Sequence, residues 1–219
     1  MQLNTVIFDM DGLLIDSEPL WNEAANEVFT HYGINLSDEQ QATTTGLRTR
    51  EFLEWWFSYY KIGNDEFAKA EQKIFQHVFE KIQQKGKILP GVDHIFNFFH
   101  SRGFKIGIAS QSPQQMIEMV MDICCIKKFV QATSSAEYLP FGKPHPQVYI
   151  NCANALQSHV LECICFEDSF NGLIAAKAAR MKCVVVPEHS QQKEDRWNAA
   201  DLKLSSLQNF GELHLNLLQ

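Results

Sequence analysis

The most informative stretch of this sequence is Val6-Ile7-Phe8-Asp9-Met10-Asp11-Gly12, an apolar run followed by two carboxylates and a glycine. At the carboxyl end of a parallel strand, side chains two residues apart leave the same side of the backbone. Asp9 and Asp11 would bring two like charges to one site, which is unfavourable unless a cation or a proton joins them. The pattern suits a metal-assisted reaction with one carboxylate as nucleophile and the other as proton carrier. On this stretch alone, a strand followed by a plain Asp-Gly turn stays open as the alternative.

The composition is that of a globular protein that can bury a sizeable core. Of the 219 residues, 45% are hydrophobic and 21% are charged. The net charge is −7 and no basic run is long enough to follow a phosphate backbone, so nucleic-acid binding is not expected. The N-terminus lacks a signal-peptide pattern, and the chain lacks an apolar stretch long enough to span a bilayer. We therefore expect a protein without membrane contact.

The cysteine pattern indicates reduced thiols. No pair has C-x-x-C spacing, and two of the six are direct neighbours, which suits a disulfide framework poorly: Cys124, Cys125, Cys152, Cys163, Cys165 and Cys183. Reduced cysteines are typical of the cytoplasm, which is the expected location.

Short apolar runs that alternate with helical periodicity predict an α/β fold. The strand-like runs are Thr5 to Phe8, Lys105 to Ala109, Val130 to Thr133, Cys163 to Phe166 and Cys183 to Val186. Helical stretches follow most of them, including 94–100, 114–123 and 173–179. This alternation predicts a doubly wound, Rossmann-like parallel sheet whose ligands bind beyond the carboxyl ends of the strands.

Residues 18–85 interrupt the alternation, because they contain helical patterns and no strand-like run. Asp16 and Ser17 can cap a first helix that Gly33 ends. We predict an all-helical cap at 18–85, inserted into an α/β core of residues 1–17 and 86–219, and placed to act as a lid. Its aromatic cluster within 55–60 is expected to form the core of the cap. The segment 188–200 is expected to be a long mobile loop.

Three further groups stand where predicted strands end. Ser110, with Ser112 behind it, precedes a helix expected at Pro113 and is suited to hold a phosphoryl oxygen. Lys143 lies in a stretch stiffened by two prolines, which makes it a candidate phosphate clamp. Asp168 follows the fourth strand and is suited to complete a Mg²⁺ site with Asp9. Helix caps and a solvated loop lysine are the separate alternatives, but capping explains the whole set poorly.

These residues in this order resemble the four motifs of the haloacid dehalogenase superfamily: Asp9-Met10-Asp11-Gly12, Ser110, Lys143 and Glu167-Asp168. The resemblance covers the whole chain, because the helical insertion is similar to the helical cap of that superfamily. Within this superfamily, the residues around the motifs resemble those of bacterial hexitol phosphatases that also hydrolyse 2-deoxyglucose 6-phosphate. The stretches that carry this closer resemblance are 109–113, 143–149, 167–172 and 177–181.

The resemblance implies a role for each motif residue. Asp9 would attack phosphorus to give an aspartyl-phosphate, and Asp11 would protonate the departing oxygen and then activate water. Mg²⁺ would be held by the Asp9 and Asp168 carboxylates and the Asp11 backbone carbonyl, with Glu167 acting through a water or an outer contact. The charge on the phosphoryl oxygens would be balanced by Ser110 and Lys143, with Gln111 included among the phosphate- or substrate-binding residues. Positioning and neutralisation of negative charge are what phosphoryl transfer requires.

The same resemblance bears on substrate and reaction type. The β-phosphoglucomutase branch has a histidine where Trp21 stands, so a phosphosugar mutase becomes the weaker alternative. In the cap, Gly46 and Arg48 fall in the specificity loop of this branch. Arg48 would reach the sugar or the phosphate, with a solvent-facing arginine at a helix start as the alternative. Trp21 is either a wall near the leaving group or part of the core of the cap.

We therefore expect a monomeric, Mg²⁺-dependent phosphatase of small sugar or polyol phosphates, such as hexitol phosphates and 2-deoxyglucose 6-phosphate. A catalytically silent partner-binding protein on the same fold is the alternative from another class. Such a chain would be expected to have lost Asp9, Asp11, Lys143 or Asp168, and all four are present.

Overall fold

The computed structural model describes residues 2–44 and 47–219, so the predicted cap residue Gly46 lies outside the described residues. The chain divides into two compact units, one formed by the residues up to Ile15 with Ile88–Gln219 and the other by Asp16–Lys87. These boundaries lie two residues from the positions predicted from the sequence. Two short strands, β2 (Ile15–Asp16) and β3 (Lys87–Ile88), pair with each other where the chain passes between the units.

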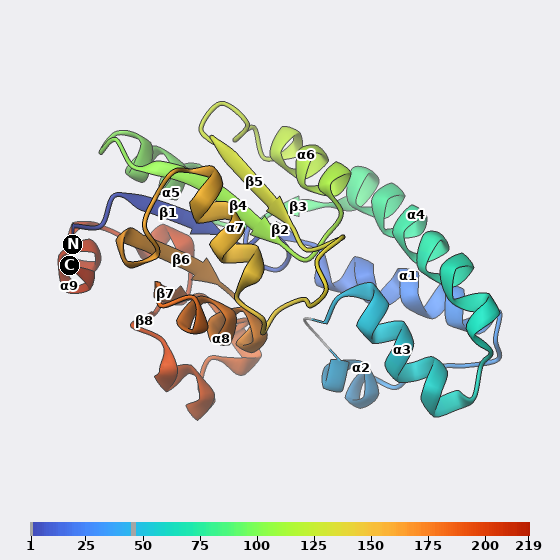
Figure 1. Cartoon of the computed structure of the whole chain (residues 1–219). Helices are drawn as coiled ribbons and strands as arrows, with labels where there is room; N and C mark the ends of the chain where they lie inside the picture. The colour runs from blue at the N-terminus through green and yellow to red at the C-terminus, as the bar shows by residue number, and fades with distance from the viewer. Residues whose placement is uncertain (1, 45–46) are drawn as a thin grey trace. The chain divides into compact units, whose positions relative to one another are not determined.

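Within the described residues, the first unit is built on a six-stranded parallel sheet in the order β5-β4-β1-β6-β7-β8 (Figure 1). The strands are β1 (Thr5–Phe8), β4 (Lys105–Ser110), β5 (Ala132–Ser135), β6 (Cys163–Glu167), β7 (Lys182–Val185) and β8 (Leu202–Lys203). The five predicted strands all lie in this sheet. β5 begins and ends two residues later than predicted, because its sequence Ala-Thr-Ser-Ser carries no apolar pattern that marks its end.

Helices cover both faces of the sheet, and the alternation of side chains along β1 shows how. Ile7 belongs to a core cluster with residues of α7 and α8 on one face. Phe8 points to the other face, where its ring stacks on Phe96 of α5 with 4.6 Å between centroids. The helices of this unit are α5 (Val92–His100), α6 (Gln114–Ile123), α7 (Gln147–Ala155), α8 (Phe170–Ala178) and α9 (Glu212–Leu218).

The order of the strands reverses at β1. After β1 the chain adds β4 and β5 on one side, and it then crosses to add β6, β7 and β8 on the other side. The prediction of a doubly wound parallel sheet is therefore confirmed. In such sheets ligands bind beyond the carboxyl ends of the strands, where the order reverses. Here that place is the end of β1, flanked by the ends of β4 and β6.

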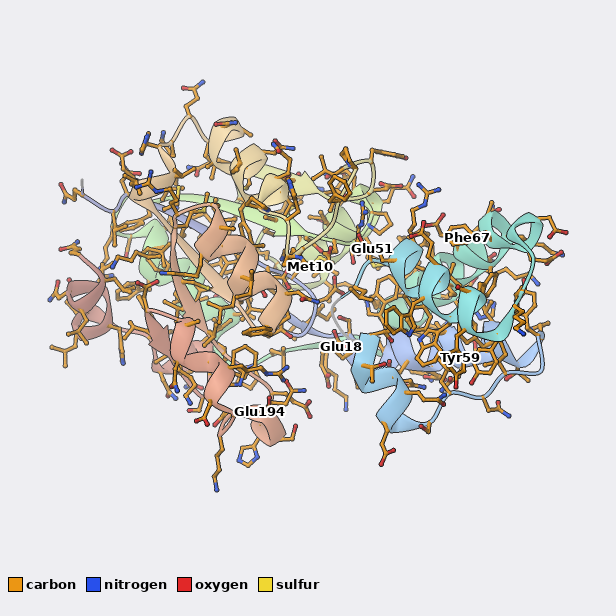
Figure 2. The ribbon with its side chains drawn as sticks, turned by 60° about the horizontal axis from the view of Figure 1, so that its bottom comes forward. Met10, Glu18, Glu51, Tyr59, Phe67 and Glu194 are labelled. Atoms are coloured by element: carbon orange, nitrogen blue, oxygen red, sulfur yellow. The ribbon has the colours of Figure 1, made fainter. Side chains whose placement is uncertain are left out.

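The second unit is all-helical in its described part between β2 and β3. It contains α1 (Glu18–Thr30), α2 (Asp38–Thr44), α3 (Thr49–Tyr60), the 3-10 helix Asn64–Glu66 and α4 (Phe67–Lys85). Figure 2 shows the crowded side chains of this unit, including Tyr59 on α3 and Phe67 at the start of α4. Of the predicted aromatic core, Trp56 and Phe57 are buried, but Trp55 and Tyr59 are 59% and 66% exposed. The prediction of an aromatic core was therefore wrong for these two residues, which lie on the outer face of α3.

The predicted long loop 188–200 has more structure than the sequence suggested. It contains two 3-10 helices, His189–Gln191 and Asp195–Ala199. The Trp197 side chain is buried, and its indole N–H donates to the Gln191 carbonyl at 2.8 Å. The buried indole, with its N–H satisfied, holds this segment against the rest of the first unit.

The cysteines are free thiols, as predicted, and all six lie in the described residues. Burial raises the pKa of the Cys124 and Cys163 thiols to about 12, so neither is a reactive thiolate near neutral pH. Among the helices of residues 2–44 and 47–219, none is both long and apolar enough for a membrane crossing.

Candidate active site

The carboxyl ends of three adjacent strands bring the predicted site residues together. Asp9 directly follows β1, Ser110 is the last residue of β4, and Glu167 is the last residue of β6. Lys143 comes from the loop between β5 and α7 and reaches the same place. Asp9, Ser110, Lys143 and Glu167 are all buried, and burial of the three charged side chains among them is exceptional unless they are paired.

Lys143 is the central cation of this cluster. Its Nζ donates to Asp9 Oδ1 at 2.5 Å, to Glu167 Oε1 at 2.6 Å and to the Ala109 carbonyl at 3.1 Å. An ammonium group has three hydrogens, and these three bonds use all of them. The side chain is therefore fixed, with its charge shared between two carboxylates.

The cluster holds more negative charge than one lysine can balance. Burial raises the pKa of the Asp9 carboxyl well above its ordinary value, and Lys143 offsets this only in part because Glu167 and Asp11 add like charge. Burial acts to lower the pKa of Lys143, but the charges of Asp9 and Glu167 outweigh it and raise that pKa. The lysine therefore carries its charge, and the site still favours a further cation beside Asp9.

Each of the two carboxylate oxygens of Glu167 accepts two hydrogen bonds. Oε1 accepts from Lys143 and from the Tyr149 hydroxyl at 2.5 Å, while Oε2 accepts from the Ser169 backbone N–H at 3.2 Å and the Ser169 hydroxyl at 3.0 Å. A carboxylate offers about four lone-pair positions. Four donors occupy them, which leaves Glu167 suited to hold Lys143 rather than to ligate a metal directly.

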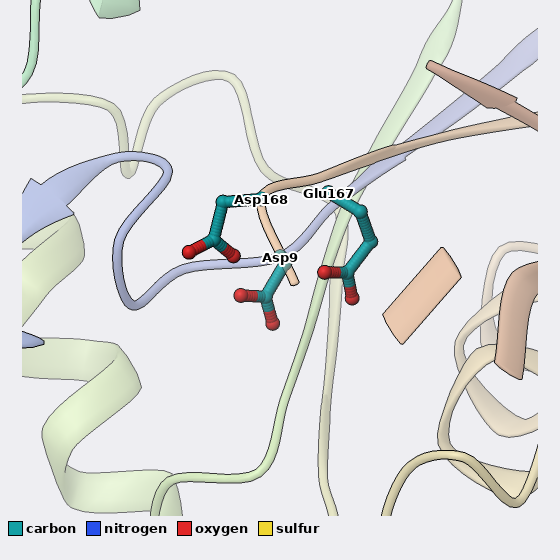
Figure 3. A group of neighbouring side chains, drawn as sticks. All are labelled: Asp9, Glu167 and Asp168. Carbon is teal, nitrogen blue, oxygen red and sulfur yellow. The ribbon is translucent and has the colours of Figure 1, made fainter. Parts of the chain in front are cut away.

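Asp168 lies on the other side of Asp9 from Glu167 (Figure 3). Oxygen atoms of Asp9, Glu167 and Asp168 lie within 4.8 Å of one another. Gly12 makes room for the Asp168 carboxylate, since a Cβ at Gly12 would lie only 2.1 Å from Asp168 Oδ2. Gly12 also has a φ of +73°, which L-residues rarely adopt. A glycine is therefore required at this position of the first motif, because any side chain there would keep the Asp168 carboxylate away from Asp9.

Two serines of the loop after β4 hold the second carboxylate of the first motif. Asp11 Oδ2 accepts from the Ser112 hydroxyl at 2.7 Å and from the Ser110 hydroxyl at 3.3 Å. The Ser110 Oγ in turn accepts from the Ser112 backbone N–H at 3.0 Å. These bonds fix the direction in which Asp11 points in this structure.

Gln111 supports the loop that carries the lysine. Its Oε1 accepts from the backbone N–H of Lys143 at 2.7 Å. This contact joins the loop after β4 to the loop before α7, so Gln111 contributes to the site at least by positioning Lys143. A contact of Gln111 with phosphate or substrate stays a prediction.

The helix-cap alternatives hold for some of these positions and not for others. Ser169 does cap α8, because its hydroxyl accepts from the Gly172 N–H at 3.0 Å. Pro113, rather than a serine, occupies the cap position of α6. Ser110 and Lys143 instead contact the two carboxylates of the first motif.

Arg48 and Trp21, the two described residues of the cap domain that were predicted to bear on substrate binding, lie in the helical unit. Arg48 is buried and precedes α3, and its guanidinium donates to Glu51 Oε1 at 2.8 and 3.1 Å. The solvent-facing alternative for Arg48 was therefore wrong. Trp21 is partly buried and packs edge-on against Phe75 of α4, with 6.1 Å between ring centroids. Its contact with α4 agrees with a place in the core of the cap.

No role was predicted for Tyr149 from the sequence, and Ser112 was not counted among the site residues. Tyr149 lies on the same helical face as the apolar Val148 and Cys152, so the sequence indicated burial. A buried tyrosine hydroxyl usually needs a partner, and that need was the available signal. Ser112 was recognised as a second hydroxyl two residues after Ser110, but its contact with Asp11 was not predicted.

Comparisons with known proteins agree with this geometry. The model of the haloacid dehalogenase-like hydrolase family matches residues 6–186. Hexitol phosphatase B of Escherichia coli K12 is 39% identical over 207 residues, covering 94% of this chain and 93% of that protein.

Solved structures show the same fold. CbbY from Rhodobacter sphaeroides, in complex with phosphate, has a TM-score of 0.87 at 22% identity and covers 98% of this chain and 99% of that one. The β-phosphoglucomutase from Clostridium difficile has a TM-score of 0.86 at 22% identity, covering 99% and 97%. The family match over most of the sequence and the residues at the end of β1 lead to one conclusion: the chain belongs to the haloacid dehalogenase-like hydrolases.

Proposed function

We propose that this protein is a Mg²⁺-dependent phosphatase of small sugar or sugar-alcohol phosphates that works through an aspartyl-phosphate. The observation that carries the proposal is the Asp9 carboxylate, which lies between the Lys143 ammonium at 2.5 Å and the Asp168 carboxylate. Asp11 stands two residues away. A nucleophile, a cation, a second acid and a metal carboxylate thus meet at one sheet edge. The 39% identity to a hexitol phosphatase supports the same class of substrate.

The residues at the end of β1 fit a magnesium ion. Mg²⁺ is usually held by one or two carboxylates, with waters and substrate phosphate completing its shell. Asp9 and Asp168 would supply the carboxylates, and the Asp11 backbone carbonyl would supply a third oxygen. Glu167 would stay outside the direct shell, because its lone pairs accept from four other donors. When bound, the ion would keep Asp9 ionised and draw negative charge from the phosphoryl oxygens.

Asp9, Lys143 and Ser110 would perform the transfer itself. The Asp9 carboxylate attacks phosphorus and the bond to the sugar oxygen breaks, which leaves the phosphoryl group on Asp9. Lys143 exchanges its bond to Asp9 for one to a phosphoryl oxygen, and the Ser110 hydroxyl binds another. Because both side chains are buried beside Asp9, their dipole and charge would stabilise the transition state after only this exchange of hydrogen bonds.

Asp11 would carry the protons. In the first step its carboxyl group protonates the leaving sugar oxygen, since an alkoxide is a poor leaving group. In the second step the resulting carboxylate accepts a proton from the water that attacks the aspartyl-phosphate, which restores Asp9 and releases phosphate. The bond from Ser112 keeps Asp11 at the end of β1 when the Ser110 hydroxyl turns from Asp11 to the phosphoryl group.

We propose that the cap residues Arg48, Trp21 and Gly46 bear on substrate choice. Replacing Arg48 with alanine should raise KM or change the ranking of sugar phosphates more than it affects a small aryl phosphate. Equal losses on both classes would indicate that Arg48 acts only through its bond to Glu51 and the start of α3.

A panel of phosphate esters tests the proposed function. Phosphate release should be measured from hexitol phosphates, 2-deoxyglucose 6-phosphate, hexose phosphates and an aryl phosphate, with Mg²⁺ and again with EDTA. We expect release that needs the metal and is highest on the polyol or deoxysugar esters. The Asp9→Asn variant should stay folded and lose turnover. Transfer of the phosphoryl group to a second sugar hydroxyl would favour a mutase, and an active Asp9→Asn protein would contradict the mechanism.

A further inference from the structure

Tyr149 is the second donor to Glu167 Oε1, and it comes from α7 rather than from the loops that carry the motif residues. Its side chain is fully buried and its hydroxyl donates to Glu167 Oε1 at 2.5 Å. The face of its ring lies 4.8 Å from the Lys143 Nζ, within the range of a cation–π contact. One side chain therefore contacts both members of the Glu167–Lys143 pair.

The backbone of α8 and four hydrogen-bond donors enclose the Glu167 carboxylate. A Cβ at Gly172 would lie only 1.8 Å from the Glu167 carboxylate, so the backbone of α8 closes one side of the carboxylate. Ser169 occupies Oε2 with two hydrogen bonds, and Oε1 accepts from Lys143 and Tyr149. The carboxylate is thus fixed in place, and only Oε1 acts on the lysine.

Lys143 is shared between two carboxylates at nearly equal distances, 2.5 Å to Asp9 and 2.6 Å to Glu167. How strongly Glu167 attracts the ammonium depends on what else Oε1 accepts. A hydroxyl hydrogen on Oε1 neutralises part of its charge and weakens its attraction for Lys143. The ammonium is then held less strongly by Glu167, and it interacts more strongly with Asp9 and with a phosphoryl group attached to Asp9.

We propose that Tyr149 is a positioning residue for phosphoryl transfer, which acts through Glu167 to keep Lys143 directed at Asp9. This inference rests on the proposed phosphatase function. Without the hydroxyl, Lys143 would be the only donor to Oε1 among the described residues, and the ammonium would shift toward Glu167. Binding of the phosphoryl group would weaken, although every residue of the four motifs is still present.

The Tyr149→Phe variant tests this, because it removes one oxygen and keeps the buried ring. Tyr32→Phe is the matched control, since the Tyr32 hydroxyl also donates to a carboxylate, Glu66 Oε2 at 3.1 Å, within the helical unit. The measurement is calorimetric binding of trifluoroberyllate, a mimic of the phosphoryl group on aspartate, in the presence of Mg²⁺. The binding stoichiometry reports the folded fraction, so a change in affinity is separated from loss of fold.

We expect Tyr149→Phe to weaken trifluoroberyllate binding and to lower kcat/KM by about tenfold, the lower end of the range found when a hydrogen-bond partner of a metal ligand is removed. Tyr32→Phe should change neither. In a Glu167→Gln background the Tyr149→Phe effect should shrink to about twofold or less, because residues that act through one another are not additive.

Unchanged affinity in Tyr149→Phe, or an equal effect in the Glu167→Gln background, would overturn the role of Tyr149 while leaving the proposed function intact. A wild-type protein that hydrolyses no phosphate ester but binds trifluoroberyllate would refute the proposed function alone. A wild-type protein that does neither would refute both.

Discussion

Replacement of Lys143 by methionine is the perturbation whose effect on stability follows most directly from the contacts in the site. Methionine is similar in length and fills the space, but it leaves the buried carboxylates of Asp9 and Glu167 without the ammonium that lies 2.5 and 2.6 Å from them. Breaking a buried ion pair by removing one partner destabilises proteins by about 3–5 kcal/mol. For a chain of this size, that corresponds to a fall in Tm of roughly 6–20 °C.

The pH dependence of that loss distinguishes an electrostatic cause from a packing defect. In the native protein burial raises the pKa of Asp9, and Lys143 acts against this rise. Without the lysine the pKa of Asp9 rises further. A carboxyl group whose pKa is higher in the folded state than in the unfolded state destabilises the fold when ionised, and the penalty disappears as the pH falls and the group is protonated. The deficit of Lys143→Met should therefore be largest near neutral pH and should shrink toward acid.

The assay is urea unfolding of wild type and variant at several pH values between neutral and acid, with EDTA present. Lys105→Met is the control, because within residues 2–44 and 47–219 the Lys105 Nζ donates only to the carbonyls of Leu156 and Gln157, at 2.7 and 2.9 Å. Its loss should be about 1–2 kcal/mol and should not change with pH. A Lys143→Met deficit below about 1 kcal/mol, or one that does not vary with pH, would show that the ammonium does not stabilise the fold by balancing the charge of Asp9.

The other predictions concern two positions near the end of β1. Ser112→Ala removes the 2.7 Å bond to Asp11 and should lower kcat on sugar phosphates by about tenfold, a small part of what general acid catalysis supplies. An activated aryl phosphate, whose leaving group needs no proton, should be affected less, and equal losses would contradict this role. Gly12→Ala should destabilise the fold by about 1–3 kcal/mol. It should also weaken Mg²⁺ binding in a metal titration, because the new Cβ meets Asp168. Gly33→Ala is its control, with a φ of +71° and nothing within 4 Å of the added carbon. A Gly12→Ala protein that binds Mg²⁺ like Gly33→Ala would show that Asp168 is not displaced.

The main parts of the site could be predicted because each stands directly after an apolar run. Asp9, Ser110 and Glu167 end or follow strands that are neighbours in the sheet, so their convergence follows from the fold class. Lys143 was predicted from its rigid surroundings and from resemblance, although its distance to Asp9 depends on a loop that periodicity does not describe.

The outer contacts of the site were not predictable in the same way. Tyr149 reads as one more buried residue of a helix, and its hydroxyl gains a role only when α7 packs beside the end of β6. Arg48 was predicted either to reach the substrate or to face solvent, and its bond to Glu51 and its burial followed from neither pattern. Trp197 lies in a polar segment whose sequence suggests a loop, and only the tertiary structure shows that its ring is buried. Such contacts join distant parts of the chain, and local patterns carry no information about them.

Trapping of a phosphoenzyme shows whether Asp9 accepts the phosphoryl group. The Asp11→Asn protein should be mixed with Mg²⁺ and an activated aryl phosphate, quenched in acid, digested and analysed by mass spectrometry. An asparagine at this position can assist neither the leaving group nor the attacking water, so the activated ester should phosphorylate the enzyme and the second step should be slow. We predict one phosphoryl group on Asp9, and none when EDTA is present or when Asp9 is asparagine. A phosphoryl group on another residue, or phosphate release with no trapped phosphoenzyme, would show that Asp9 is not the nucleophile.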